Sequence, residues 1–389
     1  MRREILVLSV AFVIVMVTGC AVGERSLPPR WNELLTAEPL VITVPPLPTL
    51  SYPTPGSPTP TAVPPLLPTE YGIQIHGCGY DPEPALDLVQ EAGFTWVKQQ
   101  VRWEEIEPEP GVTSWDCIDQ VVDGASRRGL KVLLSVTTSP VWSRSGQESG
   151  HPWNPASFGQ FCMRMVERYR GRIHAVEVFN EPNLEREWGP FMNPAEYAGM
   201  LEWSYYGIKQ ASPDVMVISA GLAPTQWSAW DVALPDDRFL SELVLLGGLQ
   251  WADCVGAHFN HGTQPPLVEG GQFEQLVLGY REITGEKKPI CLTEFGYAVP
   301  RGNGNGLPQG FEWAVENTAE EQAQWLAEGW QWAEAHPGVL RLVIVWNLNY
   351  WSDDPQDSNA LYAIWTPRGM MPAYETLREA NTWVVSLDR

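Results

Sequence analysis

Two glutamates, Glu181 and Glu294, each follow a short apolar run that would be buried in a folded protein. Burying an ionised carboxylate costs on the order of several kcal/mol unless it gains partners or serves a reaction, so a strand-end ion pair is the alternative for each residue alone. As a pair, one protonated carboxyl can donate to the oxygen that leaves a glycosidic bond, while an ionised one attacks or activates water. The residue types therefore indicate glycoside hydrolysis, provided that the fold brings the two side chains together.

From Tyr71 onward, short β-rich runs alternate with longer helical patterns, which is typical of parallel strand–helix units. The alternation predicts an α/β fold, a closed (β/α)8 TIM barrel, because eight strands are each followed by a helix and no glycine-rich phosphate loop follows the first strand. The predicted strands are Tyr71–His76, Trp96–Val101, Lys131–Val136, Ala175–Phe179, Val215–Ala220, Cys254–Phe259, Ile290–Thr293 and Leu342–Trp346. The predicted helices include Asp116–Arg128, Phe158–Tyr169, Ala195–Gln210, Phe273–Ile283, Glu320–Ala335 and Pro372–Ala380.

In a TIM barrel the chemistry lies at the carboxyl ends of the strands. Glu181 ends the fourth predicted strand and Glu294 ends the seventh, and these two strands face each other across the barrel axis. We therefore expect both carboxyl groups to act on one bond. Glu177 lies four residues before Glu181 on the same face of its strand, so we expect it to be a paired structural charge inside the barrel.

The motifs at 180–182 (Asn-Glu-Pro) and 293–296 (Thr-Glu-Phe-Gly) resemble the paired signatures of the clan A retaining glycosidases. That clan includes the cellulase-like family 5 and the xylosidase/iduronidase-like family 39, and the resemblance covers about residues 71–385. It implies that Glu181 is the general acid/base, that Glu294 is the nucleophile and that Asn180 holds the sugar 2-hydroxyl. The implied activity is hydrolysis of a β-linked oligo- or polysaccharide by double displacement.

Other residues are expected at the substrate because of their place in the pattern. In this clan a histidine often ends strand six and a tryptophan ends strand eight, and His258 and Trp346 match those positions. We expect Tyr297 to reach the nucleophile, and His76, at the exit of strand one, either to contact substrate or to pack at the top of the barrel. Three loop tryptophans are expected either to line the cleft or to pack in the core, namely Trp142, Trp227 and Trp230.

Strand two departs from the pattern of the clan. The segment 102–108 (Arg-Trp-Glu-Glu-Ile-Glu-Pro) resembles a structural stretch of clan members, which often also carry an arginine that orients the nucleophile. Lys98 occupies that place here, and lysine lacks the bidentate fork of arginine. Either Lys98 orients the nucleophile less rigidly, or Arg102 does so, or neither does. The rival interpretation is therefore a non-catalytic surface glycan-binding protein on a glycosidase-like barrel.

The composition of the chain limits which classes of ligand and partner it can bind. The chain of 389 residues has a formal net charge of −22, which argues against nucleic acid because phosphate binding needs a basic face. There is no Cys/His cluster at zinc spacing, and His261 beside His258 lacks a further ligand at usable spacing. We therefore expect neither metal nor cofactor. The expected partner is a carbohydrate substrate, bound by a monomer.

The six cysteines show no Cys-x-x-Cys pair. Cys254 and Cys291 lie inside apolar runs, which predicts free, buried thiols at both positions. Cys78 and Cys117 fall in loops that could lie side by side, so the sequence leaves open whether they are joined in a disulfide.

The first 69 residues differ in composition from the rest. Residues 1–20 read as a secretory signal with a positive start and a short apolar run, and Val-Thr-Gly-Cys at 17–20 resembles a bacterial lipobox that would lipidate Cys20. Residues 21–69, rich in Pro, Thr and Ser, predict a semi-rigid, disordered spacer. Residues 70–389 are then the catalytic domain. The expected location is extracytoplasmic, as a cell-surface lipoprotein or a secreted protein, with the lipid on Cys20 as the only membrane contact.

Replacing the predicted lipid acceptor tests this location. Cys20→Ala is expected to release the protein from membranes or to leave its precursor uncleaved, because the signal enzyme cleaves before the thiol that carries the lipid. Fractionation and the mass of the mature chain provide the measurement. A Cys20→Ala protein that is processed and sediments with membranes like the parent would show that the anchor lies elsewhere.

Overall fold

The computed structural model describes residues 67–387 apart from 145–149, 226–231, 302–306, 353 and 355. The predicted signal segment, nearly all of the predicted spacer, and both Trp227 and Trp230 lie outside the described residues. No helix in the described part of the chain is both long enough and apolar enough to span a membrane.

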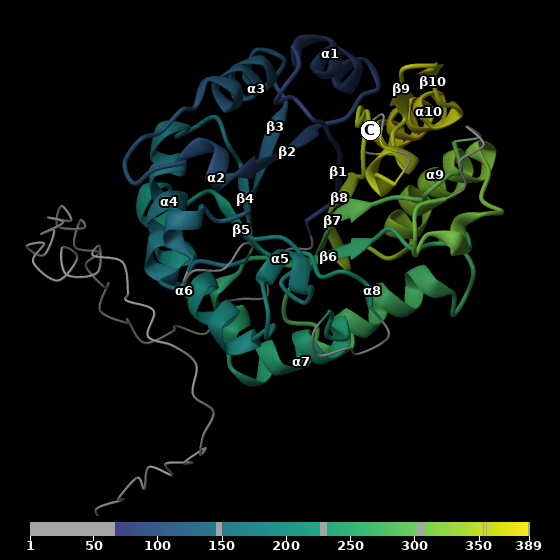
Figure 1. Cartoon of the computed structure of the whole chain (residues 1–389). Coiled ribbons are helices and arrows are strands. Elements are labelled where there is room, and N and C mark those ends of the chain that lie inside the picture. The colour runs from purple at the N-terminus through teal and green to yellow at the C-terminus, as the bar shows by residue number, and fades with distance from the viewer. Residues whose placement is uncertain are drawn as a thin grey trace, which may run out of the picture. The chain divides into compact units, whose positions relative to one another are not determined.

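Eight parallel strands form the inner ring of the molecule and helices surround it (Figure 1). The strand order is β5-β4-β3-β2-β1-β8-β7-β6, and a bridge between Ile218 and Cys254 connects β5 to β6. This is the predicted (β/α)8 TIM barrel, and each observed strand overlaps a predicted one. The strands are β1 Glu70–Gln74, β2 Trp96–Arg102, β3 Lys131–Thr137, β4 Ala175–Val178, β5 Met216–Ser219, β6 Val255–Phe259, β7 Ile290–Phe295 and β8 Leu340–Val345.

The outer helices begin where the sequence supplies caps. Asn154 and Asn193 each accept a hydrogen bond from the second helical amide and are followed by proline, whose missing N–H costs nothing at a first helical position. Thr318 and Glu321 form a capping box. The helices are α1 Glu83–Glu91, α2 Trp103–Ile106, α3 Asp116–Arg127, α4 Pro155–Arg168, α5 Glu185–Trp188, α6 Pro194–Ala211, α7 Asp236–Leu245, α8 Gln272–Ile283, α9 Ala319–Ala335 and α10 Pro372–Leu387. A small antiparallel pair, β9 Trp365–Thr366 and β10 Gly369–Met370, precedes α10.

Buried apolar side chains fill the interior of the barrel. One cluster takes residues from six of the strands and from the position just before β6, so it is a packed core and not a pore. Its members are Trp96, Leu133, Ala175, Ile218, Cys254, Cys291, Leu342 and Ile344. Above this layer the strands carry polar and charged side chains that are also buried, and these form the candidate site.

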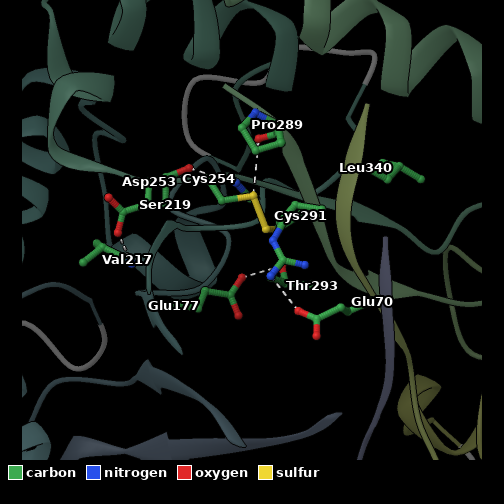
Figure 2. The surroundings of a disulfide bond; sticks show 12 residues. Glu70, Glu177, Val217, Ser219, Asp253, Cys254, Pro289, Cys291, Thr293 and Leu340 are labelled. Atoms are coloured by element: carbon green, nitrogen blue, oxygen red, sulfur yellow. Dashed lines mark hydrogen bonds and ion pairs between the residues drawn. A yellow bond between two sulfur atoms is a disulfide. The ribbon is translucent and has the colours of Figure 1, made fainter. Parts of the chain in front are cut away.

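The prediction of free thiols at Cys254 and Cys291 is wrong, because the two sulfurs form a disulfide inside the barrel core (Figure 2). Cys254 lies just before β6 and Cys291 is the second residue of the neighbouring strand β7, with 6.0 Å between their Cα atoms. A second disulfide joins Cys78 to Cys117, which settles the alternative that the sequence left open. Cys162 is a free, buried thiol.

Removing the inner disulfide should destabilise the barrel. Cys254→Ala together with Cys291→Ala is expected to lower the free energy of unfolding by about 2–4 kcal/mol, because the sulfur bond closes a long loop in the unfolded chain. Chemical denaturation measures the loss. As a control, peptide mapping of unreduced, denatured protein after alkylation should find Cys162 modified and both Cys254 and Cys291 unmodified. Alkylated Cys254 or Cys291 would contradict the pairing.

Candidate active site

Glu181 and Glu294 meet at the carboxyl end of the barrel, with His258 between them. The Nδ1 atom of His258 lies 3.0 Å from Oε1 of Glu181 and 3.4 Å from Oε2 of Glu294. One carboxylate oxygen of each glutamate and one ring nitrogen of His258 all lie within 4.8 Å of one another. Residues 36 to 113 positions apart in the sequence therefore converge on one small volume, as the ends of strands four and seven of a barrel predict.

An unusual backbone path turns Glu181 into the barrel mouth. After β4 ends at Val178, both Phe179 (φ +73°) and Glu181 (φ +38°) adopt left-handed conformations that side-chain-bearing residues seldom take. The amide of Glu181 donates to the carbonyl of Gly221 at 3.1 Å, which ties this bend to the chain after β5. Such strain persists only where the surrounding structure imposes it, and it commonly marks functional residues.

The position of His258 depends on a register shift and on a glycine. The pairing of β6 with β7 shifts between Ala257 and His258, which sets His258 opposite Glu294. The imidazole is fully buried and lies so close to Gly221 that a Cβ there would be 2.1 Å from its Cδ2 atom. Any larger residue at position 221 would displace His258, so the ring has a fixed place between the two glutamates.

Lys98, and not Arg102, is the strand-two cation at Glu294. The fully buried ammonium of Lys98 lies 3.5 Å from Oε1 of Glu294 and donates to the carbonyl of Thr293 at 3.0 Å. Arg102 is half-exposed and pairs instead with the neighbouring carboxylates of Glu104 and Glu105. The alternatives that the sequence left open are thus resolved in favour of Lys98.

Glu177 is the paired structural charge that its position on the strand predicts. Its Oε2 atom lies 3.0 Å from the Nζ atom of Lys98, and its Oε1 atom accepts from the amide of Gly221 at 3.0 Å. Oε1 also accepts from the hydroxyl of Thr293 at 2.5 Å (Figure 2). Oε1 also lies 3.7 Å from Nε2 of His258. Burial opposes its ionisation, but Lys98 and His258 outweigh that effect and hold the pKa of this carboxyl far below its usual range.

His258 is a cation in this arrangement. Burial alone would lower its pKa, but the carboxylates of Glu294, Glu177 and Glu181 outweigh burial and raise the pKa to about 10. Although the three donor atoms are close enough to bridge a metal ion, a histidine ligates metal only when it has lost that proton. The contacts of His258 with Glu177, Glu181 and Glu294 fit an imidazolium shared by carboxylates.

The pKa order of Glu181 and Glu294 in the described structure is the reverse of the order that their predicted roles require. Burial raises the pKa of Glu181, but His258 and Arg186 outweigh it and lower that pKa to about 2. Burial also raises the pKa of Glu294, and there the attraction of His258 and Lys98 does not reverse the increase. A general acid must carry a proton when substrate is bound, so its surroundings must change on binding.

Two charged residues of α5 contribute to the site and were not predicted. Nη2 of Arg186 lies 2.8 Å from Oε2 of Glu181, and its Nε atom lies 3.9 Å from Oε1 of Glu187. Burial and the charge of Glu181 raise the pKa of Glu187 to about 7. The available sequence signal was the charged run 185–187 directly after the Asn-Glu-Pro motif.

The site opens into a cleft of about 1400 Å³ at the carboxyl ends of the strands. Asn180 and Trp346, two residues predicted to bind substrate, line the cleft. The Oδ1 atom of Asn180 is buried without a hydrogen-bond partner among the described residues. The peptide bond between Trp346 and Asn347 is cis. Two unpredicted residues also line the cleft: Asn260 donates to Oε2 of Glu294 at 3.4 Å, and Tyr362 donates to the carbonyl of Asn260 at 2.6 Å.

Three residues considered for the substrate site do not line the described cleft. The expectation that Tyr297 reaches the nucleophile is wrong, because its ring is buried among aromatic side chains and its hydroxyl donates to the carbonyl of Gln264 at 3.1 Å. Trp142 is not among the residues that line the described cleft, since its indole packs against Trp103 and donates to the carbonyl of Glu107. His76 packs edge-on against Trp346 and Tyr350 and is not among the residues that line the described cleft, which favours the packing alternative. Burial lowers its pKa to about 4, so the ring is neutral.

The buried cation of strand two can be tested by stability. Lys98→Met is expected to lower the free energy of unfolding by about 3–5 kcal/mol at neutral pH, because it leaves Glu177 buried with less compensating charge. The pKa of Glu177 is depressed in the folded wild type, so its stabilising effect is present above its unfolded pKa of about 4.3 and is lost as the pH falls. The difference in free energy of unfolding between Lys98→Met and the wild type should therefore shrink as the pH falls through about 4.

Two control variants make this experiment specific. Arg102→Met removes an exposed cation from the same strand and should change stability by no more than about 1 kcal/mol. Adding Glu177→Gln to Lys98→Met removes the orphaned charge and should restore part of the lost stability. Equal losses from Lys98→Met and Arg102→Met, or a loss independent of pH, would mean that Lys98 does not balance the buried carboxylates.

Comparisons with known proteins agree with this architecture. The family model of cellulase, glycosyl hydrolase family 5, matches residues 65–236. A β-1,4-xylanase of Dictyoglomus thermophilum is 27% identical over 110 residues, which cover 27% of this chain and 28% of the relative. The β-galactosidase BbgII of Bifidobacterium bifidum is 30% identical over 120 residues, which cover 24% of this chain and 17% of the relative. The chain thus matches less than a third of the length of either curated relative.

Solved structures extend the likeness over the whole barrel. A family 39 glycoside hydrolase from the gut symbiont Bacteroides cellulosilyticus WH2 superposes with a TM-score of 0.63 at 18% identity, over 82% of this chain and 64% of that one. Xylanase 10B of Thermotoga maritima superposes with a TM-score of 0.57 at 14% identity, over 82% of this chain and 96% of that one. These structures show that the chain shares their barrel fold, and the match to the family 5 model, which includes the Asn-Glu-Pro motif at 180–182, confirms the resemblance to the cellulase-like family over that part of the chain.

Proposed function

We propose that this chain is a retaining glycoside hydrolase that cleaves a β-linked oligo- or polysaccharide by double displacement. The observation that carries the proposal is the close approach of Glu181 and Glu294. One carboxylate oxygen of each lies within 4.8 Å of the other and of a ring nitrogen of His258. Retaining enzymes hold their carboxyl groups about 5–5.5 Å apart, whereas inverting enzymes leave about 6.5–9.5 Å for a water molecule. The short separation supports direct attack by a carboxylate.

Each glutamate has partners suited to one role. Glu294 is the nucleophile, oriented by Lys98, His258 and Asn260, and its carboxylate oxygen forms a bond to the anomeric carbon as the glycosidic C–O bond breaks. Glu181 donates its proton to the departing oxygen. It then takes a proton from the water that attacks the anomeric carbon, which releases the sugar and regenerates Glu294.

The cleft supports a sugar as the ligand. Trp346 offers an aromatic surface on which the C–H face of a pyranose can stack, and the unpaired Oδ1 atom of Asn180 can accept from a sugar hydroxyl. The relatives that share parts of this chain include a β-1,4-xylanase and a β-galactosidase, which supports a β-linkage. The position of Lys98 beside Glu294 weakens the main argument for the rival, non-catalytic glycan-binding protein.

We also propose an extracytoplasmic location, with a lipid on Cys20 and a monomeric catalytic domain. The two disulfides of the described residues support an oxidising compartment, because cytosolic thiols are kept reduced. The spacer would then separate the barrel from the membrane surface.

Rescue by azide separates the roles of the two glutamates. Glu181→Ala should still complete the first step with substrates whose leaving groups need no proton, but its second step should stall because no base activates water. Added azide, which needs no base, should restore turnover and yield a β-glycosyl azide. Glu294→Ala should lose the first step for every leaving group, and azide that enters the vacated space should yield the α anomer.

Proton NMR of the azide products reads the anomeric configuration directly. Exchanged anomers would mean that the two roles are reversed. Unchanged activity in either variant would remove that glutamate from the mechanism. A wild-type protein that binds aryl β-glycosides and polysaccharides without hydrolysing any of them would favour the glycan-binding alternative.

A further inference from the structure

Both carboxylate oxygens of Glu181, the general acid of the proposed mechanism, are paired with cations. His258 contacts Oε1 of Glu181 at 3.0 Å, and Arg186 contacts Oε2 at 2.8 Å. A carboxyl held in this way stays ionised and offers no free oxygen to a glycosidic bond. One of the two cations must therefore leave before Glu181 can take up and donate a proton.

Arg186 is the contact that can move. His258 is fully buried, contacts Glu177 and Glu294 as well, and fits closely against Gly221, so its position is fixed. The side chain of Arg186 is 69% exposed, lines the cleft and belongs to α5, a helix of four residues. α5 lies inside the ring of outer helices, over the barrel mouth (Figure 1).

A second carboxylate lies next to Arg186. Oε1 of Glu187 is 3.9 Å from the Nε atom of Arg186, at the outer limit of an ion pair, and the Glu187 side chain is only 25% exposed. Burial, followed by repulsion from Glu181, raises the pKa of Glu187 to about 7, so this carboxyl carries a proton in mildly acidic solution. It is both a destination for the guanidinium and a source of the proton that Glu181 lacks.

We propose, resting on the hydrolase function above, that Arg186 is a positioning residue which pairs with Glu181 as in the described structure and moves to Glu187 when a sugar occupies the leaving-group side. The movement exchanges a guanidinium for a proton. Protonated Glu187 gives its proton to ionised Glu181, and Arg186 neutralises the carboxylate left on Glu187, so the net charge of the cleft is unchanged. Glu181 becomes an acid only when a sugar is present to receive its proton.

The charges around Glu181 in this exchange come from three elements. Glu181 faces the cation of His258 on β6, the carboxylate of Glu294 on β7, and both Arg186 and Glu187 on α5. Once Arg186 has moved, Glu181 keeps one cation and faces the anionic Glu294. Repulsion between those two carboxylates, together with burial, then favours the protonated form of Glu181.

The pH dependence of catalysis distinguishes this exchange from a purely structural ion pair. The alkaline limb of kcat/KM reports the acid of the free enzyme, and that of kcat reports the acid of the complex. Arg186→Gln should shift the kcat/KM limb upward by about one pH unit or more for phenyl β-glycosides, because an adjacent opposite charge lowers a carboxyl pKa by about that much. The kcat limb should stay in place, because Arg186 has already left Glu181 in the complex.

Further variants and substrates make the experiment specific. Glu187→Gln removes the destination of Arg186, so the alkaline limb of kcat should move downward by about one pH unit. Neither variant should shift the profile for 2,4-dinitrophenyl β-glycosides, whose departure needs no proton. The control is Arg172→Gln, which removes a cation from the outer surface of the barrel, where Arg172 pairs with Asp123, and should leave every profile unchanged.

The outcomes separate this inference from the proposed function. In Arg186→Gln, the alkaline limbs of kcat/KM and of kcat should respond differently. If both limbs shift together, or if neither limb shifts, the exchange is refuted even when the enzyme is active. Carbon-13 NMR of the glutamate side chains in the free protein gives a second readout that needs no turnover. The titration midpoint of Glu181, assigned with Glu181→Gln, should rise in Arg186→Gln, and an unmoved midpoint would also refute the exchange. A wild type that hydrolyses no glycoside refutes the hydrolase, while the titration still tests the ion pair.

Discussion

A balance of buried charge underlies the described barrel mouth. Glu177, Glu181 and Glu294 are nearly inaccessible to water, and an unpaired carboxylate in such a place would be prohibitively costly. Lys98 and His258 lie between them, so each cation serves more than one carboxylate. The third cation comes from outside the barrel, as Arg186 of α5. Two of the compensating charges are thus part of the rigid strands, and one is attached to a short surface helix.

This balance dictates much of the local backbone. His258 can contact three carboxylates only because the β6–β7 register shifts beside it and because residue 221 has no side chain. Glu181 can turn toward the imidazole only because two residues after β4 accept left-handed backbone angles. These features are costly in isolation. The ion pairs and hydrogen bonds that they make possible are the interactions that offset them.

Periodicity and position were enough to predict the barrel, the convergence of Glu181 and Glu294, and the buried pairing of Glu177. Each of these follows from strand order and from the alternation of side chains along a strand. The Cys254–Cys291 bond could not be predicted in the same way, because it depends on how far β6 is offset against β7. Arg186 and Tyr362 lie on segments after the strands, where direction is set by tertiary packing. The prediction for Tyr297 was wrong for the same reason. Tyr297 follows the end of β7 at Phe295, and its ring packs against that phenylalanine.

The two edges of β6 are held very differently. On one side the register with β7 and the sulfur bond join it to the strand that carries Glu294. On the other side, an isolated bridge between Ile218 and Cys254 and a few further hydrogen bonds, such as the one from the amide of Ser219, connect it to β5. Segments with few backbone hydrogen bonds open first in a native protein. If β6 separated locally from β5, His258 and Glu294 would move together, and Glu181 would stay with the chain after β4. Warming would then separate Glu181 from Glu294 while most of the helical ring is still folded.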